Sequence, residues 1–449
     1  MTSTLLKKYA APVPRYTSYP TAPHFSDAVS PALYADWLSA LPADQPLSLY
    51  FHVPYCDTMC WFCGCHTKIT ARYGPIDSYL ASMIAEVDLV ADALPGRMPV
   101  KHIHWGGGSP TILRAADMLR LSDTIHQRFD VAEDAEFAVE IDPRGFDPIA
   151  VRALADAGVN RVSLGVQDVN DDVQKAINRV QPFEETREVV ENLRAEGITR
   201  INIDLMYGLP LQTDAHIRET VAKVLTLAPS RIALFGYAHV PWMKSHQKMI
   251  NEAALPDSDT RLAHMNLATD LLVGAGYVAI GLDHFALPDD PLAEAQQNRQ
   301  MNRNFQGYTT DGAVTLIGFG ASAIGASPFG YAQNIPAIRD YRRAVEAGEL
   351  PISKGIALSN DDRMRRDLIQ TLMCDLEVDL SALLREHDLP GNALDRECAT
   401  LQDLEQDGII DRSGPRIRVT EEGRQFVRVV CARFDAYLGR GPGRHSQAV

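Results

Sequence analysis

Residues 47–65 read LSLYFHVPYCDTMCWFCGC, an apolar run followed at once by four cysteines. Cys56, Cys60 and Cys63 have the spacing C-x3-C-x2-C, which lets one short loop surround an inorganic centre and present three thiolates from one side. Iron–sulfur clusters are held by cysteine thiolates in this way. With three protein ligands, a four-iron cluster keeps one iron open to a further ligand. The spacing therefore indicates a reactive cluster.

Other interpretations of the same cysteines remain open at this point. Cys65 could complete a four-cysteine zinc site, Cys60 and Cys63 could form a thioredoxin-like redox pair, or the cysteines could form disulfides. Disulfides are the least favoured, because the chain is long, its seven cysteines are odd in number and no apolar signal region precedes them. These features predict a cytoplasmic location. The remaining thiols lie in helical patterns and are expected to be core residues: Cys374, Cys398 and Cys431.

Composition limits the classes of function. The chain has 449 residues, 46% hydrophobic and 22% charged, which is enough for a large core and more than one domain. No apolar run approaches the roughly 18 residues that span a bilayer, so no membrane association is expected. The net charge of -15 argues against nucleic acid as a partner. An anionic ligand must therefore be met by locally placed arginines.

A predicted strand and a predicted helix alternate through the first half of the chain. Short β-rich apolar runs predict strands at 47–53, 102–105, 136–141, 161–166, 201–206 and 231–237. Amphipathic patterns predict helices at 76–94, 115–129, 148–157, 184–196 and 215–227. Repeated strand–helix units predict an α/β fold, a partial (β/α)6 TIM-like barrel whose site lies in the loops after the strands.

The unusual residues match that arrangement, because they follow the predicted strands. The cysteine loop follows the first strand, and the others are Gly106-Gly107-Gly108-Ser109, Glu140, Asp142, Gln167, Asp168 and Asp204. The glycines permit close backbone approach and offer amide hydrogens to a carboxylate. Asp142 precedes Pro143 and is expected to cap a helix. His102 and His104 alternate along the second strand and are expected to have no ligand role.

The last quarter of the chain changes character. Helical patterns at 361–375 and 393–407 precede a turn at Gly414-Pro415, and a final helix is predicted over 421–438. This order predicts a mostly helical, winged-helix-like domain, and its acidic balance favours a packing or lid role over DNA binding. The predicted division is an N-terminal segment at 1–45 that contacts the active site, a barrel at 46–285, a covering segment at 286–358 and the C-terminal domain at 359–449.

The whole chain resembles a known family. Tyr50 to Cys65 and His104-Trp105-Gly106-Gly107-Gly108-Ser109-Pro110-Thr111 resemble the radical S-adenosylmethionine (SAM) enzymes. Further segments narrow the resemblance to the oxygen-independent coproporphyrinogen III oxidases, or coproporphyrinogen dehydrogenases: 14–20 (PRYTSYP), 139–144 (VEIDPR), 165–168 (GVQD), 202–210 (NIDLMYGLP), 304–310 (NFQGYTT) and 331–334 (YAQN). Ser109 stands where the family commonly has threonine, and it keeps the hydroxyl.

The resemblance implies roles for the matching positions. Cys56, Cys60 and Cys63 would hold a [4Fe-4S] cluster. The positions implied for a first SAM are Tyr50, Gly107, Gly108, Ser109, Glu140, Gln167, Arg179 and Asp204, with Glu140 meeting a cationic part, Arg179 an anionic part and Asp204 a ribose hydroxyl. The positions implied for a second SAM or for general cofactor binding are Phe62, Ala238, Phe305, Gln306 and Ile324. Cys65 and Arg15 are implied as residues that act on the substrate, Arg15 as a partner for a propionate.

The resemblance also implies a reaction. A 5′-deoxyadenosyl radical from SAM would take hydrogen from the β-carbon of a propionate, and loss of carbon dioxide and one electron would leave a vinyl group. Two rounds would convert coproporphyrinogen III to protoporphyrinogen IX for haem biosynthesis. An electron donor such as flavodoxin or ferredoxin is expected, and a monomer. The alternatives are a haem-binding chaperone, a haem-modifying radical SAM protein and, more remotely, a winged-helix regulator with a sensing cluster.

Overall fold

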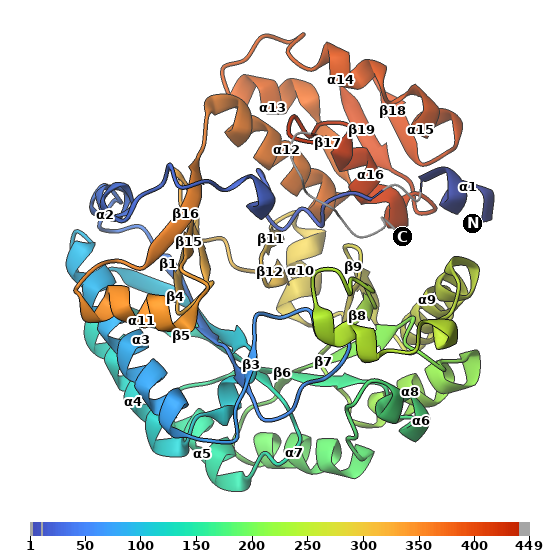
Figure 1. Cartoon of the computed structure of the whole chain (residues 1–449). Helices are drawn as coiled ribbons and strands as arrows, with labels where there is room; N and C mark the ends of the chain where they lie inside the picture. Colours follow the sequence, from blue (N-terminus) through green and yellow to red (C-terminus); the bar gives the residue numbers. More distant parts are fainter. Residues whose placement is uncertain (1–2, 10–11, 440–449) are drawn as a thin grey trace.

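The computed structural model describes residues 3–9 and 12–439 and is built around one 12-stranded sheet (Figure 1). Parallel pairing joins neighbouring strands through the centre of the sheet, in the order β13 (Thr315–Phe319), β1 (Leu47–Val53), β4 (Pro99–Gly107), β5 (Asp130–Ile141), β6 (Arg161–Gln167), β7 (Arg200–Tyr207) and β8 (Arg231–Gly236). The strands predicted within 47–237 are all present, with ends that differ by a few residues. The central sheet is thus mostly parallel.

Helices cover the outside of this sheet. They are α3 (Gly74–Ala93), α4 (Ala115–Arg128), α5 (Pro148–Asp156), α6 (Asp171–Ala176), α7 (Phe183–Ala195) and α8 (Asp214–Thr226). All but the short α6 were predicted. Side chains cap the first turns of α5 and α8, where Asp147 accepts a hydrogen bond from the Ala150 amide and Thr213 accepts one from the His216 amide. A strand that is buried on both faces has apolar residues at successive positions. These continuous apolar runs are the pattern from which the strands were predicted.

The sheet extends further than predicted. On the β1 side, β13 is followed by antiparallel β14 (Ile324–Ala326), β15 (Gly330–Asn334) and β16 (Ile352–Ala357). The glycines of 312–330 hid β13, β14 and the start of β15, since glycine is depleted from strands. A Cβ atom at Gly330 would lie 2.1 Å from the carbonyl oxygen of Ile356, so the close approach of β15 and β16 requires glycine there.

The remaining elements outside the C-terminal unit lie in the N-terminal segment, in the loops of the sheet, at its β8 edge and in the connecting segment. They are η1 (Ala22–His24), α2 (Pro31–Ser39), β2 (Tyr55–Cys56), β3 (Lys68–Ile69), η2 (Pro110–Ile112), η3 (Ser245–Met249), η4 (Glu252–Ala254), α9 (Ser258–Gly274), β9 (Val278–Ile280), β10 (His284–Ala286), α10 (Pro291–Gln297), β11 (Asn302–Asn304), β12 (Gly307–Thr309) and α11 (Ile338–Glu346). β10 pairs antiparallel with β8 and β9, and β11 forms a hairpin with β12.

The C-terminal unit has its own core and three-stranded sheet. It contains α12 (Asn360–Asp375), β17 (Glu377–Asp379), α13 (Leu380–Glu386), α14 (Asp395–Ala399), α15 (Gln402–Gln406), β18 (Ile410–Ser413), β19 (Arg416–Val419), η5 (Arg424–Phe426) and α16 (Val427–Ala432). The single helix predicted at 393–407 is two short helices, interrupted at Thr400 and Leu401, and the Leu401 side chain is buried. The helix predicted over 421–438 is shorter than expected. Cys374 and Cys431 are buried as predicted, whereas Cys398 is only half-buried.

The N-terminal segment packs against this C-terminal unit (Figure 1). In α1 (Ser3–Tyr9), the Tyr9 ring lies 5.7 Å from the Phe426 ring, and its hydroxyl donates to Asp407 at 2.5 Å. Val13, Tyr16 and Tyr19 belong to the same hydrophobic cluster. Segments at the two ends of the chain are therefore folded together over the barrel. Within the described ranges, no helix has the length and apolar character that crossing a membrane would need.

A buried carboxylate joins α3 to the unpredicted strands. Glu86 is 1% exposed and accepts hydrogen bonds from the Tyr341 hydroxyl at 2.6 Å, the Asn334 amide group at 2.6 Å and the Gly320 backbone N–H at 2.7 Å. Buried polar groups of this kind stabilise a fold only while every partner is satisfied.

Replacing Glu86 with alanine should lower the free energy of unfolding by about 2–4 kcal/mol, because three buried donors lose their acceptor. Denaturant unfolding of the cluster-free protein measures the loss. Glu346→Ala is the matched control, since this side chain is 61% exposed and pairs only with Arg342 in its own helix; it should change stability by less than about 0.5 kcal/mol. Equal losses in the two variants would contradict the structural role of Glu86.

Candidate active site

The cysteine loop leaves the end of β1 and is held by side chains from other loops. Cys60 is buried, Cys56 and Cys63 are half-buried and Cys65 is exposed. The bonds that fix the loop backbone run from Asn178 Nδ2 to Met59 O (2.8 Å), from Gln247 Nε2 to Phe62 O (3.0 Å), between His246 Nε2 and Cys63 O (2.7 Å) and from Lys244 Nζ to Cys65 O (2.9 Å). The thiols of the loop are therefore positioned by the 178 and 244–247 loops as well as by their own spacing.

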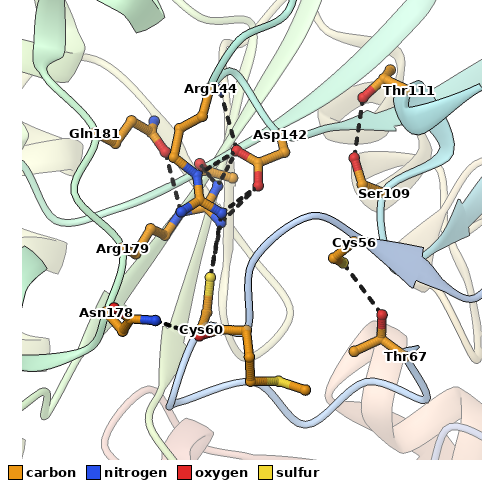
Figure 2. A network of polar contacts seen from close by, with 12 residues as sticks. Cys56, Cys60, Thr67, Ser109, Thr111, Asp142, Arg144, Asn178, Arg179 and Gln181 are labelled. Atoms are coloured by element: carbon orange, nitrogen blue, oxygen red, sulfur yellow. Dashed lines mark hydrogen bonds and ion pairs between the residues drawn. The ribbon is translucent and has the colours of Figure 1, made fainter. Parts of the chain in front are cut away.

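Two arginines contact the buried thiol (Figure 2). Arg144 Nη2 and Arg179 Nη1 each lie 3.5 Å from Cys60 Sγ. Both guanidinium groups also donate to Asp142, at 2.6 Å from Arg144 and 3.2 Å from Arg179. Burial alone would raise the pKa of Asp142, but the two arginines hold that pKa below its usual range. The arginine pair can thus stabilise negative charge on the Cys60 sulfur.

This network corrects one expectation. Asp142 does not cap a helix, because α5 begins later and its first turn is capped by Asp147. Asp142 instead bridges Arg144 and Arg179. Arg144 was not predicted as a site residue. The Asp142-Pro143-Arg144 run directly after a strand was the pattern that could have indicated it. A side chain directly past a strand end can reach either the next helix or the mouth of the barrel, and only the folded chain shows which.

The glycine turn packs directly on the cysteine loop. A Cβ atom at Gly108 would lie 2.6 Å from Tyr55 O, so the two loops approach too closely for any other residue. The Gly107 amide donates to Glu140 at 3.1 Å, the Gly108 amide to Val53 O at 2.8 Å and the Ser109 amide to Tyr55 O at 2.8 Å. The expectation that these amides are offered to a ligand carboxylate is therefore wrong. The three amides donate to Glu140, Val53 and Tyr55 of the protein itself. The glycines allow the turn to pack closely against the backbone of the cysteine loop.

Glu140 and Tyr50 lie in a group of polar rings inside the mouth. His104 Nε2 lies 3.2 Å from Glu140 Oε1, and the His104 ring stacks on the Tyr50 ring at 5.8 Å. Tyr50 in turn contacts His52 Nδ1 at 3.0 Å. Burial alone would raise the pKa of Glu140, but the His104 contact and the Gly107 amide keep that pKa below its usual range. His104, expected to have no such role, thus joins the site; its position two residues before Gly106 on the same face of the strand was the available signal.

Asp204 is held on the neighbouring strand ends. It accepts hydrogen bonds from Ser163 Oγ at 3.0 Å and Asn202 Nδ2 at 2.8 Å. Burial and then the charge of Glu140 raise the pKa of Asp204 to about 6.

Gln167 and Arg179 meet at Gly165, where a Cβ atom would lie 3.0 Å from Gln167 Nε2 and 3.1 Å from Arg179 Nη2. Asp168 instead is fully buried and bonds to α8 through Thr220, so it supports the fold.

The remaining predicted positions form separate groups. Gln247 Nε2 joins Phe62 to Ala238, because it donates to both backbone carbonyls, at 3.0 and 3.3 Å. Phe305 and Ile324 pack together in a cluster with Phe25 and Tyr331, and Gln306 lies in the turn between β11 and β12. Ser109 contacts Thr111 at 3.2 Å. Arg15 is exposed, and within the described residues it forms no hydrogen bond or ion pair with the cysteine loop.

The donor set fits an iron–sulfur cluster. All cysteines are free thiols, and four of them, Cys65 included, lie on one loop with cationic donors beside Cys60 and a hydroxyl donor, Thr67 Oγ1, at 3.3 Å from Cys56 Sγ. Hydrogen bonds to sulfur are the outer contacts that tune such a centre. Within the described residues, no three His, Cys, Asp or Glu side chains converge on a position for a single ion. A four-iron cluster is larger than one ion and spreads its thiolates more widely.

Comparisons with known proteins agree over nearly the whole chain. A sequence model of the radical SAM superfamily matches residues 50–224, and that of the HemN C-terminal domain matches residues 358–426. The oxygen-independent coproporphyrinogen III oxidase of Bradyrhizobium diazoefficiens is 48% identical, with 97% of each chain covered, and that of Paracoccus denitrificans is 43% identical, with 98% of this chain and 97% of the relative covered.

A solved structure is similar as well. Coproporphyrinogen III oxidase (HemN) from Escherichia coli, described as a radical SAM enzyme, superimposes with a TM-score of 0.92 at 38% sequence identity. The alignment covers 97% of this chain and 99% of that one. Similarity of this extent covers the barrel, the connecting segment and the C-terminal unit together, and is not confined to the cysteine loop.

Proposed function

The chain belongs to the oxygen-independent coproporphyrinogen III oxidases, a family of radical SAM enzymes, and on this premise we propose that it decarboxylates two propionates of coproporphyrinogen III to vinyl groups. The product is protoporphyrinogen IX, and the reaction belongs to haem biosynthesis. The observation that carries the proposal is the full-length match together with three free thiols on the loop after β1. The zinc, dithiol and disulfide interpretations are set aside with it.

The first part of the proposal concerns the cluster. Cys56, Cys60 and Cys63 hold a [4Fe-4S] cluster, and Arg144 and Arg179 stabilise its negative charge through Cys60 Sγ. When bound, the cluster and SAM supply the one-electron chemistry that removes hydrogen from an unactivated propionate carbon. The protein supplies orientation and exclusion of water. Cys65 stays off the cluster, because a fourth thiolate would close the reactive position.

The second part concerns SAM. Glu140, kept ionised by His104 and Gly107, meets the cationic portion of SAM, and Asp204 accepts from its ribose. Tyr50, Gln167 and Arg179 line the same mouth, while Gly107, Gly108 and Ser109 shape its wall. A second SAM would contact Ala238, Phe305, Gln306 and Ile324, and Phe62, which Gln247 joins to Ala238, also lies in the cofactor site.

The broader assignments follow from the same premise. The six β/α units act as a partial (β/α)6 barrel over 46–285, the segment 286–358 covers its mouth, and a winged-helix-like unit at 359–449 packs on the N-terminal segment, 1–45, as a lid. The free thiols favour the cytoplasm. The enzyme acts as a monomer that receives electrons from a flavodoxin or ferredoxin.

Product analysis tests the function. The anaerobically reconstituted protein, given SAM, a reductant and coproporphyrinogen III, should release two carbon dioxide molecules per substrate and form protoporphyrinogen IX. The identity of the tetrapyrrole is read by chromatography and mass. Deoxyadenosine without decarboxylation, in protein with a full cluster, would favour a haem-binding chaperone or a haem-modifying enzyme. A requirement for dioxygen would exclude the radical reaction.

SAM affinity should depend on the ionisation of Asp204. Because its pKa is raised to about 6, the carboxylate is present at pH 7.5 and is lost as the pH falls through 6. SAM should therefore bind about fourfold more weakly at pH 5.5 than at pH 7.5. Titration of the cluster-loaded protein with SAM measures this dependence, and Asp204→Asn should flatten it while lowering affinity at pH 7.5. The same pH dependence in Asp204→Asn would assign the effect to another group.

A further inference from the structure

Four arginines from four parts of the chain converge beside the barrel mouth. Arg15 lies in the N-terminal segment, and the others are Arg261 of α9, Arg303 of β11 and Arg428 of α16. Arg15 and Arg303 both act electrostatically on Asp283 and on Arg428. Burial raises the pKa of the Tyr207 hydroxyl at the end of β7, and the positive charges of Arg261, Arg428 and Arg15 all oppose that rise. The barrel, the connecting segment and both ends of the chain therefore contribute to one basic cluster.

Aromatic rings and a glycine position two members of this cluster. The Arg261 guanidinium carbon lies 5.8 Å from the centre of the Tyr207 ring, and a Cβ atom at Gly208 would lie 2.5 Å from Arg261 Nη1. The Arg303 guanidinium carbon lies 4.4 Å from the centre of the Tyr308 ring. Tyr308 is itself buried and donates to Met373 O at 2.9 Å. Cation–π contact fixes a guanidinium group while leaving its N–H donors free for a ligand.

Two members of the cluster keep donors for a ligand. Within the described ranges, neither Arg261 nor Arg303 forms an ion pair, and Arg303 Nε and Nη1 are buried with no hydrogen-bond partner. The nearby carboxylate, Asp283, already contacts His284 at 2.7 Å. Burial, with the charge of Arg15 after it, lowers the pKa of Arg428 to about 10. The unpartnered donors of Arg303 are costly to bury, and this cluster stands in a chain whose net charge is -15. Such an arrangement suits a ligand that brings carboxylates.

The cluster adjoins the proposed cofactor site. Tyr207 follows Asp204 by three positions on β7, and the charge of His284 reaches Asp204. The His284 ring also meets the Tyr308 ring edge-on at 5.5 Å. A ligand bound by the arginines on one side would thus face the SAM and cysteine-loop residues on the other.

We propose that Arg15, Arg261, Arg303 and Arg428 form the receptor for the propionate carboxylates of the substrate and so orient the tetrapyrrole toward the cysteine loop. The inference rests on the proposed function, because coproporphyrinogen III carries four propionates. Guanidinium groups bind carboxylates through paired N–H donors, which fixes orientation as well as affinity. Because the receptor is assembled from the N-terminal segment, the barrel and the C-terminal unit, it also explains why the two ends of the chain are folded together over the mouth.

Porphyrin binding tests the receptor independently of turnover. The probe is coproporphyrin III, the oxidised fluorescent porphyrin with the same four propionates, added to the cluster-loaded protein with SAM. Its neutral tetra-amide has the same skeleton without charge. Arg261→Gln and Arg303→Gln should each weaken coproporphyrin III binding by about tenfold to a hundredfold. Each should change tetra-amide binding by less than about threefold, since an uncharged ligand makes no charge-assisted bond.

Matched controls separate recognition from folding. Arg299→Gln removes an arginine four positions before Arg303 that is 62% exposed and pairs with Glu377; it should leave affinity within about twofold. Arg303→Lys, which keeps the charge but loses the planar fork, should fall between wild type and Arg303→Gln. The melting temperature and SAM affinity of each variant report its folding.

Two outcomes would overturn the receptor: unchanged affinity for coproporphyrin III in Arg261→Gln and Arg303→Gln, or equal losses for the porphyrin and its tetra-amide. Failure of the proposed function looks different. In that case the wild-type protein forms no protoporphyrinogen IX, while the arginine variants still weaken binding of the tetracarboxylate.

Discussion

Replacing Cys60 with alanine should leave the purified protein without a stable cluster and without detectable decarboxylation. Cys60 is the most buried thiol of the loop and contacts both Arg144 and Arg179. Its loss removes one of the three proposed thiolate ligands and leaves two guanidinium groups without the sulfur they contact. Iron and acid-labile sulfide content, together with the visible absorption of the cluster, measure the effect. Cys56→Ala and Cys63→Ala should behave in the same way.

Cys398→Ala is the matched control for these variants, because Cys398 is a half-buried thiol of the C-terminal unit, remote in sequence from the loop. It should keep full iron, sulfide and turnover. Iron and sulfide at the wild-type level in Cys60→Ala would show that the cluster is held by other residues.

Cys65→Ala should keep the cluster and lose turnover. Cys65 is exposed at the end of the loop, and its backbone is fixed by Lys244 at 2.9 Å. Burial raises the pKa of Tyr50 well above its usual value, and the charges of Glu140 and Cys65 add to that rise, so the thiol lies on the side of the mouth that holds both residues. A thiol there can exchange a proton with the substrate, a role worth roughly 10²–10⁴-fold in rate.

Three measurements distinguish this role from cluster binding. Iron content and SAM affinity in Cys65→Ala should match wild type, while protoporphyrinogen IX formation falls by at least about a hundredfold. Cys65→Ser tests the thiol itself, since it keeps the size and the backbone bond. Loss of iron from Cys65→Ala would instead make Cys65 a ligand and the site a closed one.

Local sequence accounted for the elements with strong periodicity and for the cysteine loop. The parallel strands from β1 to β8 are continuous apolar runs because helices cover the sheet, and the helices between them have regular amphipathic patterns. Thiols close together on one loop are likewise visible, since their spacing can be read from the sequence, although the loops that hold them cannot. The glycine-rich strands β13 to β15 were not predicted, because their local pattern is not typical of strands. The glycine at 330 is required by a contact with backbone far along the chain, at Ile356.

The sequence by itself determined the βα order, the thiolate loop and, through resemblance, the family and its reaction. The tertiary structure alone decided which side chains meet: Asp142 joins two arginines at Cys60 instead of capping a helix, His104 contacts Glu140, and the glycine amides bind Val53 and Tyr55. It also brought Arg15 and Arg428, from opposite ends of the chain, near enough to act electrostatically on Tyr207. The physical reason is that a residue's type and neighbours fix its local conformation, whereas its partners depend on which strand ends and loops the folded sheet makes adjacent.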